Sequence, residues 1–481
     1  MPPPNAARGA ADPVDLGRNI GLPPSAACWS LRSPRYLGLY SWASRKKKVS
    51  PRLCPDAGRS WLAWDWQLNL VARSRLSLEH WLEVDSNSLS SLSSASGRGI
   101  VLVTELFPPD VGGTPELFDN IYRRLTGPVT VLTNDRPTPV GRLREGTLQV
   151  VRLPMVGGHW GVTSPASVWR YWRMVSELRT RCRMQPVVFH CARALPEGFA
   201  ALCATRLSRS SRYVCWTHGE ELHYMRTSRE LSLLLSSVHK ASAAVIANSR
   251  NTARQLQALG VPDDKIHVVY PGVDVDRFAH TAGRIGVRRE FAADHELLLL
   301  TVGRLQRRKG HDLAIEALAS LRGEKLHVRY LIVGDGDERA RLEGLVDRCG
   351  VRDQVTFAGS VPAADLPRYY AAADIFVHPN RVDDGDAEGF GMVFLEAAAA
   401  ALPVIGGDSG GVPEAIEAGA TGLLVTGTAV GELVSAIRTL AGDAALRRRM
   451  GELALSRVRR QFTWERAAAQ VAAIHAHVSS D

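Results

Sequence analysis

The acids Glu388 and Glu396 stand at the two ends of a short segment that begins Glu-Gly-Phe-Gly-Met-Val. Gly389 and Gly391 allow the backbone to approach a ligand closely, and the alanine-rich run 393–402 predicts a helix that begins just after them. A helix N-terminus offers unpaired N–H groups and a positive dipole end, which suit phosphate. Because the two carboxylates lie roughly 12 Å apart, the segment predicts a phosphate held between two groups of sugar hydroxyls.

A basic loop could supply the matching positive charge. Arg304 and Lys309 lie in Gly303-Arg-Leu-Gln-Arg-Arg-Lys-Gly310, directly after an apolar run that predicts a strand. Ligands on open α/β sheets bind beyond the carboxyl ends of strands. An arginine can grip phosphate with two N–H groups, and a lysine adds a point charge. Each segment alone could be an ordinary surface turn, but together the two favour a diphosphate site.

Two motifs in the first half of the chain follow predicted strands in the same way. Gly112 and Gly113 lie in the first strand-to-helix loop, where paired glycines permit a close backbone approach to a ligand, although a plain turn fits equally well. His218 lies in Thr217-His-Gly-Glu-Glu221 after the predicted strand 213–217. A structural histidine is the ordinary alternative, but the strand-end position favours a role in the site.

Short apolar strands alternate with helices along the whole chain after residue 98, a pattern typical of parallel sheets covered by helices on both faces. The fold class predicted is α/β, with two doubly wound Rossmann-like domains. The predicted strands are 100–104, 129–133, 148–153, 187–190, 213–217 and 243–247 in the first series, then 297–302, 330–333, 355–357, 375–378 and 403–405.

The domain boundaries follow from the same pattern. We expect an N-terminal domain over 98–285, a C-terminal domain over 286–462, and a connector at about 271–293. The last segment, 463–481, predicts a helix that packs back across the junction. Residues 1–97 are rich in Pro, Ser and basic residues and hold six of the eleven tryptophans. They are either a poorly ordered extension or spurious sequence upstream of the true start, and we favour the second.

Composition limits the classes of function. The chain has 481 residues, 45% of them hydrophobic and 22% charged, as in a soluble globular protein. It has no apolar run long enough to predict a transmembrane helix and no secretory signal. The seven cysteines show no CxxC spacing, so neither a zinc site nor a disulfide framework is predicted. The net charge of +10 predicts an acidic partner, such as a phosphorylated substrate or an anionic membrane.

Two further motifs are weaker. Val333-Gly-Asp-Gly336 is followed by Arg339 where GxGxxG requires glycine, which argues against a hydride-transferring Rossmann site. Asp384-Gly-Asp386 matches the DxD that some glycosyltransferases use for a metal, but it lies in a flexible acidic loop, and we predict no metal there. No nucleic-acid-binding motif is present, so a nucleic-acid partner is not expected.

From about residue 99 to 478, the chain resembles a retaining glycosyltransferase of the GT-B fold, family four, the group with an E-x7-E motif. The resemblance depends on seven ordered segments: Gly112-Gly113, 217–221, Ala247-Asn-Ser249, Tyr270-Pro-Gly-Val-Asp274, 303–310, Glu388…Glu396 and 407–414. The pattern is similar to that of phosphatidylinositol α-mannosyltransferases. The resemblance implies two domains facing across a cleft, a hexose donor such as GDP-mannose, and a lipid-linked or glycan acceptor.

The resemblance also implies the roles of individual residues. Arg304 and Lys309 would neutralise the leaving diphosphate, Glu388 would accept hydroxyls of the donor sugar, and His218 would contact the sugar near the reacting carbon. Glu396 would accept the ribose hydroxyls. The other donor-binding residues implied are Gly112, Gly113, Phe390, Gly391, Met392 and Val393. No metal and no resident cofactor are implied, and the expected location is cytoplasmic or peripheral on the cytoplasmic face of a membrane.

Two other functions and one membrane question stay open. A GT-B sugar-nucleotide epimerase would hydrolyse the donor without an acceptor, and a basic adaptor would bind membranes or nucleic acid without catalysis. Helix 167–184 places Val168, Tyr171, Trp172, Val175, Leu178 and Cys182 on one predicted face, with Arg170, Arg173 and Arg181 opposite. This face could lie in a membrane interface or pack in the core.

Overall fold

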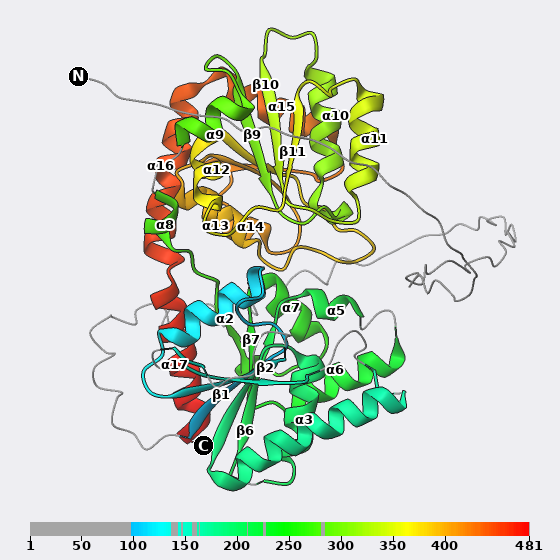
Figure 1. Cartoon of the computed structure of the whole chain (residues 1–481), viewed down its shortest axis with the longest axis vertical. Coiled ribbons are helices and arrows are strands. Elements are labelled where there is room, and N and C mark those ends of the chain that lie inside the picture. Colours follow the sequence, from blue (N-terminus) through cyan, green and yellow to red (C-terminus); the bar gives the residue numbers. More distant parts are fainter. Residues whose placement is uncertain are drawn as a thin grey trace, which may run out of the picture. The chain divides into compact units, whose positions relative to one another are not determined.

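A computed structural model of the chain describes residues 98–480, apart from 136–142, 146–147, 156–160, 163, 209, 225–227 and 280–283. The predictions for residues 1–97 concern sequence outside this range. Within it, the chain builds two parallel sheets with helices on both faces (Figure 1).

The first sheet has eight strands in the order β3-β4-β2-β1-β5-β6-β7-β8, and only β3 runs antiparallel to its neighbour. Its strands are β1 (Gly99–Thr104), β2 (Val129–Asn134), β3 (Leu143–Glu145), β4 (Leu148–Leu153), β5 (Val187–Cys191), β6 (Arg212–Thr217), β7 (Ala244–Ala247) and β8 (Ile266–Val268). The helices of this part are α2 (Gly113–Arg123), α3 (Pro165–Met184), the π-helical turn η3 (Ala194–Gly198), α4 (Phe199–Thr205), α5 (Glu220–Tyr224), α6 (Arg229–Ala241), α7 (Arg250–Ala258) and the 3-10 turn η4 (Asp263–Lys265).

The second sheet has six parallel strands in the order β11-β10-β9-β12-β13-β14. Its strands are β9 (Leu297–Val302), β10 (Val328–Val333), β11 (Val355–Gly359), β12 (Ile375–His378), β13 (Val404–Gly407) and β14 (Gly422–Val425). Its helices are the 3-10 turn η5 (Arg307–Lys309), α10 (His311–Leu321), α11 (Arg339–Cys349), α12 (Leu366–Ala372), α13 (Met392–Ala399), α14 (Val412–Ala415), α15 (Val430–Gly442) and α16 (Ala444–Gln461).

Both sheets reverse their direction of winding at one point. In the first sheet β1 lies between β2 and β5, and in the second β9 lies between β10 and β12. A crevice forms beyond the carboxyl ends of the strands at such a switch point, because the flanking connections leave in opposite directions. The loops after β1 and β5, and those after β9 and β12, are therefore the expected places for ligands.

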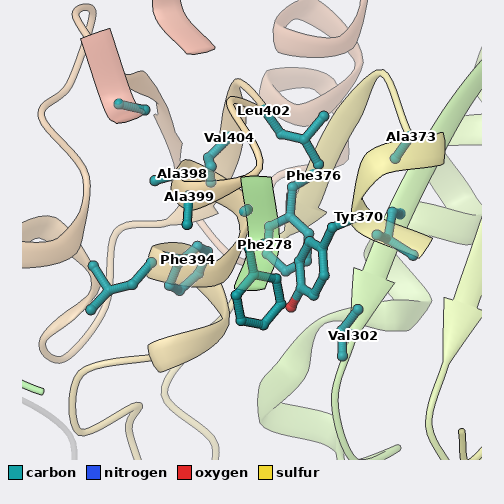
Figure 2. Close-up of a cluster of buried hydrophobic side chains, with 14 of the residues drawn as sticks. Phe278, Val302, Tyr370, Ala373, Phe376, Phe394, Ala398, Ala399, Leu402 and Val404 are labelled. Carbon is teal, nitrogen blue, oxygen red and sulfur yellow. The ribbon is translucent and has the colours of Figure 1, made fainter. Parts of the chain in front are cut away.

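The core of the second sheet fixes the helix that carries Glu396. Phe278 meets Tyr370 edge to face at 5.4 Å between ring centroids, and Phe376 lies 5.8 Å from Phe394 of α13 (Figure 2). Phe394 and Leu395 are buried. Apolar side chains at the beginning of α13 thus hold its N-terminus at the carboxyl edge of the sheet.

The connector and the C-terminal segment are helical. The connector contains α8 (Val275–Ala279) and α9 (Arg284–Phe291), and the chain ends in α17 (Trp464–Ser480). The apolar face of α17 joins the core of the first sheet through Trp464, Ala467, Ala468, Val471, Ile474 and Val478. The last helix therefore belongs to the N-terminal domain by packing, although it follows the C-terminal domain in sequence.

The face predicted for helix α3 is confirmed in part, since Val175 and Cys182 pack half-buried against the core beside Tyr171 and Leu178. The structure buries Tyr171 and Leu178, with Ser167 and Met174, but leaves Trp172 64% exposed and Val168 53% exposed. At about 100° per residue, the core-facing stripe is rotated away from Val168 and Trp172. The predicted face was too wide, and its tryptophan side lies at the surface.

Candidate active site

Glu388 lies in the loop after β12 and forms the centre of a charged cluster. Its Oε2 accepts from Lys309 Nζ at 2.5 Å, Arg308 Nη1 at 2.7 Å and Asn380 Nδ2 at 3.1 Å. Burial alone would raise the pKa of Glu388, but Lys309 and Arg308 outweigh it and lower that pKa to about 2. The carboxylate is therefore ionised at any physiological pH.

The second oxygen of Glu388 is differently placed. Oε1 accepts no hydrogen bond from any described residue, and the side chain is 13% exposed. An ionised carboxylate accepts hydrogen bonds through either oxygen and donates none. One oxygen of Glu388 is thus committed to the protein, and the other is open to hydroxyl donors.

Arg308 was not predicted from the sequence, whereas Arg304 was. Arg308 Nε also contacts Asp386 at 3.0 Å, which commits the second acid of the DxD motif to an ion pair. The Arg304 side chain is exposed, and no carboxylate pairs with it among the described residues. Its backbone carbonyl accepts from His311 Nε2 at 3.3 Å. The loop thus has two buried cations that bind Glu388, and two exposed arginines, Arg304 and Arg307.

The N-terminus of α13 lies at the same edge of the sheet. Gly391 has φ 89° and caps the helix, and a Cβ there would come within 2.6 Å of the Phe394 ring. Met392 and Val393 open the helix, so their N–H groups have no partner within it. The Phe390 ring is buried against Tyr270 and Phe462. Only the backbone of Phe390 can therefore contribute to the predicted donor site.

Glu396 faces the opposite end of this segment. Its Oε2 accepts from the Tyr370 hydroxyl at 2.5 Å, and no described residue donates to Oε1. Burial, and then the nearby Glu116, raise the pKa of Glu396 to about 7. Glu116 is itself paired with Arg277 at 2.9 Å. As in Glu388, one oxygen is held by the protein and one is open.

His218 follows β6, and its ring lies parallel to Trp216 with an interplanar angle of 9°. Its Nε2 lies 3.0 Å from the carbonyl oxygen of Ala192. Because a carbonyl oxygen can only accept, Nε2 carries the proton and Nδ1 keeps a lone pair. Burial, helped by Arg193, lowers the pKa of His218 to about 4. The imidazole is therefore neutral near pH 7 and can accept a proton or a hydrogen bond at Nδ1.

Loops from the two sheets touch around these residues. A Cβ on Gly389 would lie only 2.0 Å from the carbonyl oxygen of His218, which also accepts from Asn248 Nδ2 at 3.1 Å. A Cβ on Gly113 would lie 3.1 Å from Cε of Met392. The glycines predicted as ligand contacts thus stand where one domain meets the start of α13 in the other.

Three polar residues of this site were missed, namely Arg308, Asn380 and Asn248. Arg308 adjoins Lys309, and Asn248 lies in the quoted Ala-Asn-Ser segment, but neither pattern shows which side chain turns inward. Asn380 follows β12 by two residues, the position that a strand-end rule would have indicated.

The structure also has a cavity away from this cluster. A cavity of about 340 Å³ lies beneath α3, lined by residues such as Val103, Leu153, Met155 and Met174, and it holds none of the predicted site residues. No three His, Cys, Asp or Glu side chains in the described part of the chain gather as metal ligands would.

The sequence and the fold are similar to those of known glycosyltransferases. Residues 287–457 match the family described as Glycosyl transferases group 1, and residues 111–277 match Glycosyltransferase Family 4. A GDP-mannose-dependent alpha-(1-6)-phosphatidylinositol monomannoside mannosyltransferase of Mycobacterium tuberculosis is 33% identical over 385 residues, which cover 78% of this chain and 97% of that protein. The chain belongs to the family-four glycosyltransferases of the GT-B fold and is a glycosyltransferase.

Other similar proteins agree with this assignment. A GDP-mannose-dependent monoacylated alpha-(1-6)-phosphatidylinositol monomannoside mannosyltransferase of Corynebacterium glutamicum is 29% identical, covering 77% of this chain and 96% of that protein. Among solved structures, Anabaena HepE in complex with UDP and glucose has a TM-score of 0.66 at 20% identity, covering 78% and 98% of the two chains. Sucrose-phosphate synthase of Thermosynechococcus elongatus has a TM-score of 0.68 at 22% identity, covering 80% and 99%. These structures share the two-domain fold.

Proposed function

We propose that the enzyme transfers mannose from GDP-mannose to a hydroxyl of a lipid-linked acceptor, with retention of configuration and without a resident cofactor. The observation that carries this proposal is the pair of carboxylates, Glu388 and Glu396, on either side of a helix N-terminus. In each carboxylate the protein donates hydrogen bonds to one oxygen, and no described residue donates to the other. The names of the similar mannosyltransferases supply the choice of donor and acceptor class.

The donor would lie along α13. The open Oε1 of Glu388 would accept hydroxyls of the mannose, and the open Oε1 of Glu396 would accept the ribose hydroxyls. The diphosphate between them would bind the first N–H groups of α13, at Met392 and Val393. Arg304, which no described carboxylate holds, would turn its guanidinium to the phosphates.

The reaction breaks the bond between the anomeric carbon and the phosphate oxygen, and negative charge develops on the GDP that leaves. Lys309, Arg308 and the helix N-terminus would stabilise this charge, which is the largest electrostatic demand of the step. The acceptor hydroxyl would attack on the same face and give its proton to a phosphate oxygen of the leaving GDP. His218 would hold the sugar near its reacting carbon, with the lone pair of Nδ1 accepting a hydroxyl.

Contact with a membrane surface is part of the proposal. Trp169 and Trp172 are 55% and 64% exposed on α3, beside Val168, and the Arg173 guanidinium lies 5.3 Å from the Trp169 ring. Tryptophan and arginine on one helix face suit the interface of an anionic bilayer. Over the residues that the structure describes, no helix has the length and hydropathy of a membrane span.

The test is an assay of purified enzyme with GDP-mannose, UDP-glucose and GDP alone, each with and without phosphatidylinositol mannoside in vesicles. We expect acceptor-dependent release of GDP from GDP-mannose and the formation of an α-linked product. GDP release at an equal rate without acceptor would support the epimerase alternative. Binding of vesicles without turnover of any donor would support the adaptor alternative.

A further inference from the structure

A chain of hydrogen-bonded side chains runs through the core of the N-terminal domain, away from the donor cluster. The Trp216 indole Nε1 donates to the Tyr122 hydroxyl at 3.1 Å, and that oxygen lies 2.8 Å from Nδ1 of His190. Nε2 of His190 lies 3.2 Å from Nδ1 of His475 in α17, and Nε2 of His475 lies 3.0 Å from the carbonyl oxygen of Arg98. We call the four side chains of Trp216, Tyr122, His190 and His475 the core network.

The two ends of the core network fix the same direction of donation. An indole N–H can only donate, so the Tyr122 hydroxyl accepts from Trp216 and gives its own hydrogen to Nδ1 of His190. A carbonyl oxygen can only accept, so Nε2 of His475 carries a proton toward Arg98, and its Nδ1 accepts from Nε2 of His190. Burial lowers the pKa of His190 and of His475. Both imidazoles are therefore neutral near pH 7, with the proton on Nε2.

The core network ends beside His218, which we expect at the reacting carbon of the donor sugar. The parallel rings of Trp216 and His218 have centroids 6.3 Å apart. The Phe118 ring meets both of them edge to face, at 5.5 Å from Trp216 and 5.8 Å from His218. Phe118 lies one helical turn before Tyr122 on α2, with 6.0 Å between the two ring centroids. The plane of the His218 ring is thus set by residues that the network holds.

His190 also reaches His218 through the backbone of β5. Two residues after His190, the carbonyl of Ala192 accepts from Nε2 of His218 at 3.0 Å. The N–H of Ala192 donates to the Val103 carbonyl at 2.9 Å, which ties this backbone to β1. The position of β5 therefore fixes one nitrogen of His218 and directs the other, Nδ1, away from the strand.

The far end of the network is anchored at the end of α17, which packs against α2 (Figure 1). The Arg98 guanidinium donates to the carbonyls of Val478 and Ser479 at 3.1 and 2.7 Å. Carbonyls in the last turn of a helix have no partner within it. The Ser479 hydroxyl lies 3.3 Å from Nε2 of His475 and can share its proton. The last helix of the chain is thus held in one position relative to the network.

We propose that His475, His190 and Tyr122 are positioning residues, through which helix α17 sets the orientation of the His218 imidazole in the donor site. The inference rests on the proposed function, in which Nδ1 of His218 accepts a hydroxyl of the donor sugar. Loss of one member would leave its neighbours without their partners and allow the Trp216 ring and β5 to shift. A displaced group at the reacting carbon lowers turnover, while binding of the distant nucleotide is retained.

The first experiment removes one hydroxyl from each of two buried tyrosines. Tyr122→Phe should lower kcat roughly tenfold, within the range that small displacements in an active site produce, and leave the KM for GDP-mannose within about twofold. Tyr213→Phe is the matched control, because Tyr213 shares β6 with Trp216 but belongs to the core on the other face, where its hydroxyl donates to the Val238 carbonyl at 2.7 Å. Both variants lose a buried hydrogen bond and should melt at a lower temperature. Only Tyr122→Phe should lose turnover.

A second pair of variants separates hydrogen bonding from the shape of the ring. His475→Phe keeps a ring but loses both hydrogen bonds, so its kcat should fall as in Tyr122→Phe. His475→Gln keeps one acceptor and one donor, and its kcat should be at least about threefold higher than that of His475→Phe.

NMR spectra of isotope-labelled histidine test the network without turnover. In the wild type, the rings of His190, His475 and His218 should all be neutral with the proton on Nε2. The ring signals of His218 should shift in Tyr122→Phe and stay in place in Tyr213→Phe, because only the first variant breaks the network.

Several results would overturn the inference. Unchanged His218 signals in Tyr122→Phe would do so, and so would equal losses of kcat in Tyr122→Phe and Tyr213→Phe, which would assign the network to stability alone. His475→Gln no more active than His475→Phe, or a proton on Nδ1 of His475, would refute the hydrogen-bonded direction. A wild-type enzyme that does not consume GDP-mannose would refute the proposed function alone, because the histidine signals still show whether the network orients His218.

Discussion

At the scale of single residues, the two acids of the E-x7-E motif are built alike. Each has one oxygen held by the protein, by Lys309, Arg308 and Asn380 in Glu388 and by Tyr370 alone in Glu396. This arrangement holds the carboxylate plane before a ligand arrives and presents the other oxygen in a fixed direction. Such preorganisation lowers the cost of ordering the site during binding.

Replacing Glu388 should therefore impair chemistry more than binding of the nucleotide. In Glu388→Gln the side chain keeps its shape but loses the charge that partners Lys309 and Arg308, so those cations shift and the donor sugar loses an acceptor. We expect kcat to fall by roughly 10²-fold or more, while the Kd for GDP stays within about threefold. Steady-state kinetics and calorimetry check this. A variant with normal kcat would exclude Glu388 from the reacting sugar.

Arg304→Ala and Lys309→Ala should differ in their effect on stability. Both should lower turnover by roughly 10²-fold, because each removes a charge near the leaving diphosphate. Arg304 is exposed, so its loss should leave thermal unfolding unchanged. Lys309 is buried against Glu388, and its loss removes one of three donors to that carboxylate, of which Arg308 and Asn380 remain, so we expect a cost of about 1–3 kcal/mol. Equal melting temperatures for the two variants would contradict this burial.

Nucleotide affinity should depend on pH through Glu396. Its pKa of about 7 lies above the ordinary value of 4.5, so the folded carboxyl holds its proton while an unfolded one has lost it. This acid therefore reduces stability as pH rises from about 4.5 through 7. Because the ionised form is the better acceptor for ribose hydroxyls, GDP should bind more tightly at pH 8 than at pH 6. Calorimetry at both values should show this trend in the wild type, and Glu396→Gln should abolish it.

At the scale of elements, α3 carries two neighbouring aromatic side chains with opposite environments. Tyr171 is buried and meets Phe199 edge to face at 5.2 Å, whereas Trp172 is 64% exposed. Ser164 caps the N-terminus of the helix, because its side-chain oxygen accepts a hydrogen bond from the backbone N–H of Ser167. The adjacent positions can therefore separate a surface function from a packing function on one helix.

Trp172→Ser should weaken binding to anionic vesicles in a salt-sensitive way and change the free energy of unfolding by less than about 0.5 kcal/mol. Tyr171→Ala is the matched comparison and should cost about 3–5 kcal/mol of stability, as for a large aromatic truncated in a core. Vesicle sedimentation and urea unfolding measure the two quantities. Unchanged vesicle affinity in Trp172→Ser would argue against lipid contact by this face.

Apolar runs were enough to predict most elements of both sheets. The predicted strands 297–302 and 375–378 coincide with β9 and β12, because these central parallel strands are buried on both faces and leave continuous apolar sequence. The predicted strand 148–153 coincides with β4, which is half-buried along most of its length. Three strands at sheet edges, β3, β8 and β14, were missed. The residues of β8 are only half-buried, and β14 buries only its two end residues, so neither strand is covered on both faces as a central strand is.

The site could be predicted by segment but not by side chain. Glycine positions and strand ends indicated the segments 303–310 and 388–396, because glycine marks places where the backbone turns sharply or approaches a ligand closely. Whether Arg304 or Arg308 turns towards Glu388 depends on the 3-10 turn at Arg307–Lys309, which no local pattern reveals. The Tyr370 contact to Glu396 arises because α12 and α13 both pack against α8, and it has no signal in sequence.

At the scale of the whole molecule, the carboxylate of Glu414 links the C-terminal domain to the N-terminal domain. Glu414 accepts from the N–H groups of Arg250 and Asn251 at 2.7 and 2.8 Å, in the first turn of α7, and from the Tyr270 hydroxyl at 2.9 Å. A carboxylate at a helix N-terminus is favoured by the exposed N–H groups and the dipole. In the loop that leads to Glu414, the Gly411 N–H donates to the Glu388 carbonyl at 2.9 Å.

Glu414→Ala should therefore affect stability and donor binding together. The variant removes three hydrogen bonds to one carboxylate, and we expect the free energy of unfolding to fall by about 1–3 kcal/mol. Because the same loop supports Glu388, the Kd for GDP-mannose should also rise, by roughly fivefold for 1 kcal/mol of lost order. Glu417→Ala is the matched control: Glu417 is 64% exposed and lies 4.0 Å from Arg457. Urea unfolding and calorimetry on both variants test this prediction. Indistinguishable results for the two variants would mean that the contact of Glu414 with α7 does not support the position of Glu388.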